Sequence, residues 1–146
     1  MAICGIVCDK AGFGMTIIDG DDVKDHAVRV PTGLQADRPA ALAWLLEEAE
    51  RALSNFAITD VRVWAAPTKG RFAASAPRIE AEACVKIAAA RQGAALAFLN
   101  KEQLRAAFGI AKGPGAYDAL LERPDVAARK TKQMQEQYLL ANAPDT

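Results

Sequence analysis

The first thirty residues constrain the fold most, because they contain three strand patterns joined by links of only a few residues. Ala2 to Cys8 is a compact apolar run, and Phe13 to Ile18 follows it after a glycine-containing turn. Asp19 to Asp22 has the composition of a hairpin turn, and a third strand pattern then runs from His26 to Val30. Strands joined by such short links run antiparallel, so this segment predicts a three-stranded meander.

The remainder of the chain alternates between helix and strand patterns. We expect a helix from Asp37 to about Asn55, a strand from Val61 to Ala66, a helix from Ser75 to Gly93, a strand from Ala94 to Leu99 and a helix from Lys101 to Phe108. A meander followed by right-handed crossovers gives one mixed five-stranded α/β sheet with helices on both faces, which is the RNase H-like architecture. We expect a single domain over residues 1–146, with a helical C-terminal tail from about residue 116 that breaks near Pro124.

The composition excludes several function classes. The formal net charge is zero, which argues against a strong, general grip on nucleic acid but allows a local basic patch. No apolar run approaches the roughly 20 residues of a membrane span, and the N-terminus lacks a basic leader, so we expect a cytoplasmic protein. Three cysteines without a C-x-x-C pair, together with the single His26, make a zinc site a poor interpretation.

Three segments, in their order along the chain, resemble the RuvC-type Holliday junction resolvases. They are Cys4-Gly5-Ile6 on the first strand, Phe13 to Ile17 on the second, and Asn100 to Leu121 with its short helix and Gly-rich turn. The stretch from Lys69 to Ala73, followed by Glu80 and Glu82, is similar to a small uncharacterised bacterial family with the same fold. The resemblance implies two-metal phosphodiester chemistry with Mg²⁺ or Mn²⁺, provided that carboxylates converge from the first strand, the fourth strand and the last helix.

The acidic pattern departs from that resemblance. Val7, not an aspartate, follows Gly5-Ile6, and the fourth-strand position falls among Trp64, Ala65 and Ala66. Relocated ligands are the alternative: Asp9, then Glu80 or Glu82, then Asp118 or Asp125. Each of these acids also has a structural interpretation, as a turn opener, a helix-dipole partner or a solvated group. No metal site is therefore assigned from the sequence.

A basic turn before the second long helix is the other candidate site. Lys69, Gly70 and Arg71 precede Ser75, which caps the helix, and Arg78 lies in its first turn. Free N–H groups at a helix start attract anions, and a glycine lets the backbone approach a ligand, so a phosphate or a nucleic-acid backbone would suit this turn. The competing interpretation is a solvated loop with an ordinary serine cap.

Two functions from different classes follow. The leading one is a binding or assembly module that lacks standard two-metal nuclease activity and engages an anionic ligand, either nucleic acid or a phosphate compound, through Lys69, Gly70, Arg71 and Ser75. The alternative is a metal-dependent nuclease with relocated ligands. A small-molecule phosphate binder rests on fold analogy alone. The alanine-rich second helix predicts either a central position in the fold or a contact in a homodimer.

Overall fold

The computed structural model describes residues 1–67, 69–70 and 73–144 and contains one five-stranded sheet in the order β3-β2-β1-β4-β5. The strands are β1 (Ala2–Asp9), β2 (Gly12–Asp19), β3 (Asp22–Arg29), β4 (Ile58–Trp64) and β5 (Ala95–Leu99). The first three strands are antiparallel, whereas β4 runs parallel to β1 and β5 runs parallel to β4. The predicted mixed sheet is confirmed.

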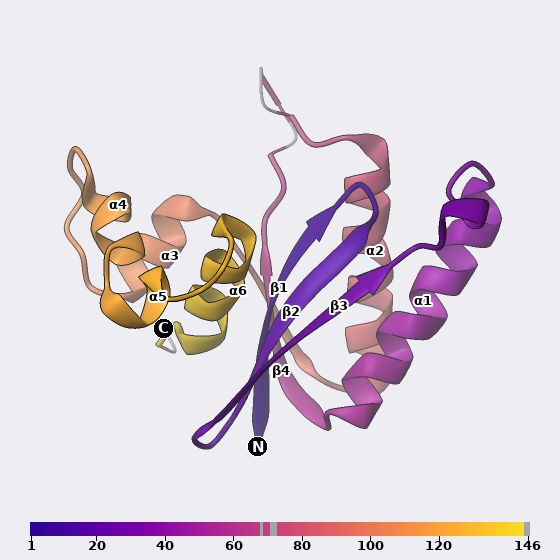
Figure 1. The fold of residues 1–146 in the computed structure, drawn as a ribbon, viewed down its shortest axis with the longest axis horizontal. Helices are drawn as coiled ribbons and strands as arrows, with labels where there is room; N and C mark the ends of the chain where they lie inside the picture. The colour runs from indigo at the N-terminus through magenta and orange to yellow at the C-terminus, as the bar shows by residue number, and fades with distance from the viewer. Residues whose placement is uncertain (68, 71–72, 145–146) are drawn as a thin grey trace.

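Helices cover both faces of the sheet, as predicted. They are α1 (Arg38–Asn55), α2 (Ala76–Gln92), α3 (Lys101–Ala107), α4 (Ala116–Leu121), α5 (Pro124–Ala127) and α6 (Lys132–Asn142), with a 3₁₀ turn η1 (Thr32–Leu34). Figure 1 shows α1 and α2 on one side of the sheet and α3 to α6 on the other. The three predicted caps form: the Asp37 side chain accepts from Ala40 N, Ser75 accepts from Arg78 N, and Asn100 forms a capping box with Gln103. No helix in these described ranges is long and apolar enough to cross a membrane.

The face that packs on α1 and α2 holds the larger apolar core. Cys4, Ile6 and Cys8 alternate along β1 and point to this side, where they meet buried side chains of both helices. Ala81, Ala88 and Ala89 of α2 are fully buried, so the small residues of this helix let it approach α1 and the sheet closely. The central position predicted for α2 is therefore confirmed. All three cysteines are free and buried.

The opposite face is covered by α6, which comes unusually close to β1. A Cβ at Gly5 would overlap the Gln137 carbonyl and lie 2.7 Å from Ala141 N, so only glycine fits beneath the helix. The buried guanidinium of Arg62 on β4 donates to the carbonyls of Leu140 and Ala143 at the C-terminal end of α6, where a positive charge is favoured. The region predicted as a helical tail thus forms three helices, and its last helix packs against the sheet.

Candidate functional site

The parallel strands β1 and β4 end at the same edge of the sheet, where an RNase H-like nuclease needs its carboxylates. The register pairs Ile6 with Val63, so Val7 and Trp64 come next along the two strands. Val7 is buried in an apolar cluster with Tyr117, and the ring of Trp64 lies 6.0 Å from the Tyr117 ring and packs against the same cluster. Apolar packing, not an acidic pocket, occupies this position.

The N-terminal half of α6 offers amides to this edge. Gln137 is 3% exposed, and its Nε2 donates to Thr16 Oγ1 at 3.3 Å. One turn earlier, Gln133 Nε2 donates to the carbonyl of Val7 at 3.4 Å. A neutral amide can position a hydrogen-bonding group, but it cannot balance the charge of a divalent cation. Gln133 therefore presents a neutral amide beside Val7, where metal chemistry would require negative charge. The carboxylate that α6 brings to this region, Glu136, lies near the cations Lys132, Arg78 and Lys101.

Asp9 opens the turn after β1. One carboxylate oxygen accepts from Ala11 N at 2.8 Å, and the other pairs with Arg29 of β3. Partial burial by itself would raise the pKa of Asp9, but the hydrogen bonds from Arg29 and Ala11 outweigh it and leave the pKa below its ordinary value. Asp9 is ionised and already neutralised by Arg29.

The two glutamates of α2 have different partners. Glu80 forms an ion pair with Arg38 of α1 at 3.1 Å, which directs it away from the edge. Glu82 is buried and accepts from Ala66 N at 3.1 Å, so it holds the backbone just after β4. Burial raises the pKa of Glu82, and the hydrogen bond from Ala66 only partly offsets this.

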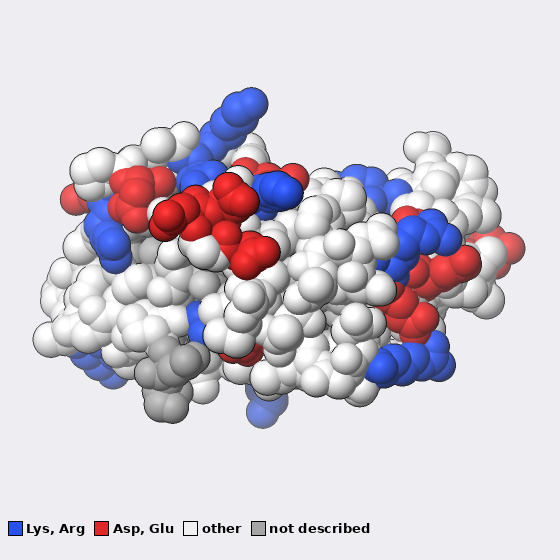
Figure 2. All heavy atoms as spheres, turned by 90° about the horizontal axis from the view of Figure 1, so that it is seen from below, with Lys and Arg blue, Asp and Glu red and all other residues white. Residues whose placement is uncertain are grey.

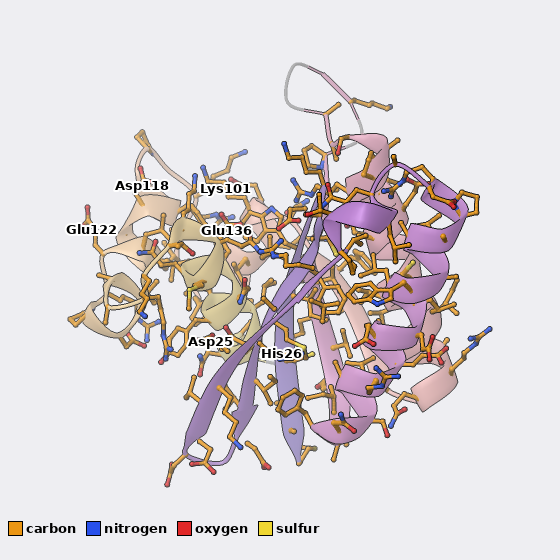
Figure 3. All side chains as sticks on the ribbon, turned by 45° about the vertical axis from the view of Figure 1, so that its right-hand side comes forward. Asp25, His26, Lys101, Asp118, Glu122 and Glu136 are labelled. Carbon is orange, nitrogen blue, oxygen red and sulfur yellow. The ribbon has the colours of Figure 1, made fainter. Side chains whose placement is uncertain are left out.

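The remaining predicted acids lie on the helical side of the molecule. Asp118 is exposed on α4 (Figure 3), and Asp125 accepts from Tyr138 Oη at 3.2 Å. Asp9 and Glu82 both lie close enough to Cys8 to help raise the pKa of its thiol, although burial is the main cause. Glu80 and Asp118 are not among the groups that affect the pKa of Cys8, so they do not lie beside Asp9 and Glu82. Within the described ranges, no group of three or more His, Cys, Asp or Glu side chains could hold a metal ion.

The predicted anion-binding turn lies between β4 and α2. In Figure 1 this turn stands at the same end of the molecule as the β1–β2 turn. Lys69 and Gly70 are exposed, and Gly70 has a φ of +81°, which favours glycine. The Ser75 hydroxyl is engaged as the helix cap, at 3.4 Å from Arg78 N. Arg71 lies outside the described residues.

A cationic cluster of Arg78, Lys101 and Lys132 lies around Glu136. Partial burial raises the pKa of Glu136 on α6, against the opposing effect of Lys132, Arg78 and Lys101. Figure 3 labels Lys101 and Glu136 on α3 and α6. Lys101 Nζ also lies 4.9 Å from the centroid of the Tyr117 ring. The sequence shows these cations one by one, but they come from α2, α3 and α6, so only the fold brings them together.

The strand order, the crossovers and the position of α6 define an RNase H-like fold that resembles the Holliday junction resolvases. The chain is similar to Thermus thermophilus RuvC in complex with a Holliday junction substrate, at 14% identity and a TM-score of 0.71 over 97% of this chain and 90% of that one. A second structure of Thermus thermophilus RuvC matches at 16% identity and a TM-score of 0.70, over 97% of this chain and 91% of that one. No protein-family model and no curated protein matches the sequence.

Proposed function

We propose that this protein is a nucleic-acid-binding module with an RNase H-like fold that does not cleave by the two-metal mechanism. The observation that carries the proposal is the packing at the strand ends. Val7 and Trp64 lie in an apolar cluster, and Gln137 stands on α6, where carboxylates would have to converge. Two metal ions about 4 Å apart need several negative charges to hold them, and these three side chains supply none. Of the carboxylates nearby, Asp9 is paired with Arg29, and Glu136 lies near Lys132, Arg78 and Lys101.

The cationic cluster supports an anionic ligand. Lys69 on the turn, Arg78 on α2, Lys101 on α3 and Lys132 on α6 all belong to elements that meet at or near the same edge. Arg78 Nε is buried without a hydrogen-bond partner among the described residues. Lysine and arginine contacts to phosphates dominate nucleic-acid affinity, so a few such residues are sufficient for salt-sensitive binding.

The opposite side of the molecule is less suited to a phosphate backbone. Figure 2 views the surface from below, away from the β4–α2 turn, and shows Lys and Arg side chains lying beside Asp and Glu side chains, with uncharged surface between the groups. Neighbouring charges of opposite sign cancel the field that would attract a polyanion. We therefore assign nucleic-acid contact to the edge where β1 and β4 end.

The similar structure of RuvC with its Holliday junction substrate guides the choice of probe. We expect a fluorescent four-way DNA junction to bind at low salt, with a slope of about −2 to −3 in a plot of log affinity against log salt concentration. Arg78→Ala and Lys101→Ala should each weaken binding several-fold. Lys24→Ala, an exposed change on β3 near the β2–β3 hairpin, serves as the matched control. Equal affinity for all four proteins would contradict the proposed surface.

We also propose that the protein forms a homodimer through the groove between α1 and α2. The groove has a volume of about 260 Å³ and is lined mainly by apolar side chains that include Leu42, Leu46 and Ile87, the last 43% exposed. The Arg38–Glu80 and Arg91–Glu50 ion pairs lie on the same two helices, and such a charge-balanced surface suits a second copy of this neutral chain. Sedimentation should give a dimer that Ile87→Lys converts to monomer. A wild-type monomer at high concentration would refute this assignment.

A further inference from the structure

A groove of about 420 Å³ lies between α6 and the β2–β3 pair, and it shares no lining residue with the cationic cluster. Its lining residues are Gly14, Asp25, His26, Ala27, Arg29, Thr131, Gln133, Met134 and Gln137. Figure 3 labels Asp25 and His26 on β3, the strand that forms its outer wall. The volume falls in the range of roughly 300–1,000 Å³ that is usual for small-molecule sites.

The amide of Gln137 is held in one orientation at this groove. Thr16 Oγ1 donates to Asp25 Oδ1 at 2.6 Å, because an ionised carboxylate can only accept. Thr16 must then accept from Gln137, which fixes Nε2 toward the hydroxyl at 3.3 Å. The side-chain oxygen of Gln137, Oε1, is left facing Gly14, and a Cβ at Gly14 would overlap it. The result is a hydrogen-bond acceptor that is fixed before any ligand arrives.

The open floor of the groove is Ala27, a small residue on β3. Gly14 pairs with Ala27 in the β2–β3 register, so the two residues lie side by side on the face toward α6. The amides of Gln137 and Gln133 cover Gly14, whereas Ala27 is exposed. His26 points to the other face, where its ring packs on Phe56 at 5.4 Å, and so its side chain does not fill the groove. The small side chain of Ala27 leaves room beside the Gln137 amide for a planar ligand.

The charged residues of the groove already have partners of opposite sign. Arg29 pairs with Asp9, and Asp25 pairs with Arg129 at 3.5 Å. A charged ligand would have to compete with these pairs, whereas a neutral one would not. The groove therefore favours an uncharged planar group with N–H donors at its edge.

From these observations we propose that the groove holds one unpaired nucleobase, with a base N–H donating to Gln137 Oε1 and the ring lying over Ala27. The proposal rests on the proposed function, since it assigns a base-reading role to a surface beside the phosphate-binding edge. Side-chain amides read base edges by hydrogen bonds, and an unpaired base exposes the edge that pairing would hide.

The first test uses free nucleosides, so that its outcome does not depend on nucleic-acid binding. We expect guanosine, adenosine, cytidine or uridine at millimolar concentration to shift the ¹⁵N-resolved signals of the Gln133 and Gln137 side chains and of Gly14. Ribose should leave them unchanged. Ala27→Phe fills the groove and should abolish the shifts, whereas Val23→Phe, a matched exposed change on the same strand, should retain them. Absence of any shift with all four nucleosides overturns the proposal.

A second measurement separates this inference from the proposed function. Four-way junctions with a single unpaired thymidine, or with an abasic residue at that position, should differ at least fivefold in affinity for the wild type. Equal affinity for both junctions, without nucleoside shifts, would refute the base site and leave the binding function intact. Nucleoside shifts without junction binding would support the base site and refute the proposed function.

Discussion

Gly14 of β2 lies directly beneath the side chain of Gln137 on α6. A Cβ at position 14 would overlap the side-chain oxygen Oε1 of Gln137 and would lie 2.9 Å from Gln133 Nε2. The missing side chain lets the helix lower two amides onto the sheet. Gly5, on the neighbouring strand, admits the helix backbone in the same way. These two glycines explain how α6 comes so close to β1 and β2.

Substitution of the two glycines should have unequal effects. Gly5→Ala places a methyl group against the backbone of α6, which cannot move without shifting the helix, so we expect a loss of about 3 kcal/mol or more in the free energy of unfolding. Gly14→Ala meets only side-chain ends, which can turn aside, so we expect a loss of about 1–2 kcal/mol. Urea titration measures both changes. Gly33→Ala, with no atom within 4 Å of the added Cβ, is the control, and an equal loss at Gly5 and Gly33 would contradict the packing described.

Placing an acid at the strand-end position should destabilise the protein and not activate it. Val7 is 7% exposed within an apolar cluster, so Val7→Asp buries a charge without a partner and should cost about 3 kcal/mol in the free energy of unfolding. The same substitution at the exposed Val23 should cost less than about 0.5 kcal/mol. If Val7→Asp were as stable as wild type and bound Mn²⁺ in calorimetry, the site would be a latent metal centre and our interpretation would be wrong.

The ion pair between Asp9 and Arg29 should stabilise the protein in a pH-dependent way. Because the pKa of Asp9 is lower in the folded than in the unfolded state, its contribution is present at neutral pH and is lost as the pH falls below about 4. Asp9→Asn should therefore reduce stability by roughly 1 kcal/mol at pH 7, and the difference from wild type should vanish near pH 2. Denaturant titrations across this range measure it, and a pH-independent difference would argue against the assigned ion pair.

Glu82 should show the opposite pH dependence. Its pKa is raised by burial, so its ionisation favours the unfolded state, and stability falls as the pH rises through the folded-state pKa. In Glu82→Gln the amide oxygen can still accept from Ala66 N, so we expect the variant to be more stable than wild type at pH 7 and equally stable below about pH 4. Thermal unfolding at several pH values measures this, and a variant that is less stable at pH 7 would show that the charge itself is needed.

The sequence predicted the fold well because its determinants are local. The Asp37, Ser75 and Asn100 caps and the hairpin turns all formed as their short patterns indicated. The start of β3 at Asp22 was harder to place, since this edge strand is exposed over most of its length and lacks a clear apolar alternation. Residues of the last segment were also hard to place, because α6 owes its position to Gly5 and Gly14, whose role depends on contacts more than a hundred residues away.

The candidate site was less predictable for the same physical reason. Partners such as Arg29 for Asp9 and Arg38 for Glu80 come from other strands or helices, so the sequence could nominate these acids but could not say that cations already engage them. The network of Gln137, Thr16 and Asp25 joins α6, β2 and β3, and only the fold brings its members together. In contrast, the sequence itself shows apolar residues, Val7 and Trp64, at positions where the acidic pattern requires carboxylates. The structure shows that an apolar cluster fills these positions.

Gel analysis of the protein with branched, duplex and single-stranded DNA and RNA, at low salt with Mn²⁺, tests the central claim most directly. Our account predicts retarded migration of at least one of these nucleic acids, without cleavage, and the same result for Asp9→Asn and Glu82→Gln. Cleavage by the wild type that either substitution abolishes would contradict it, because a relocated metal site would then operate at the edge that we assign to binding alone.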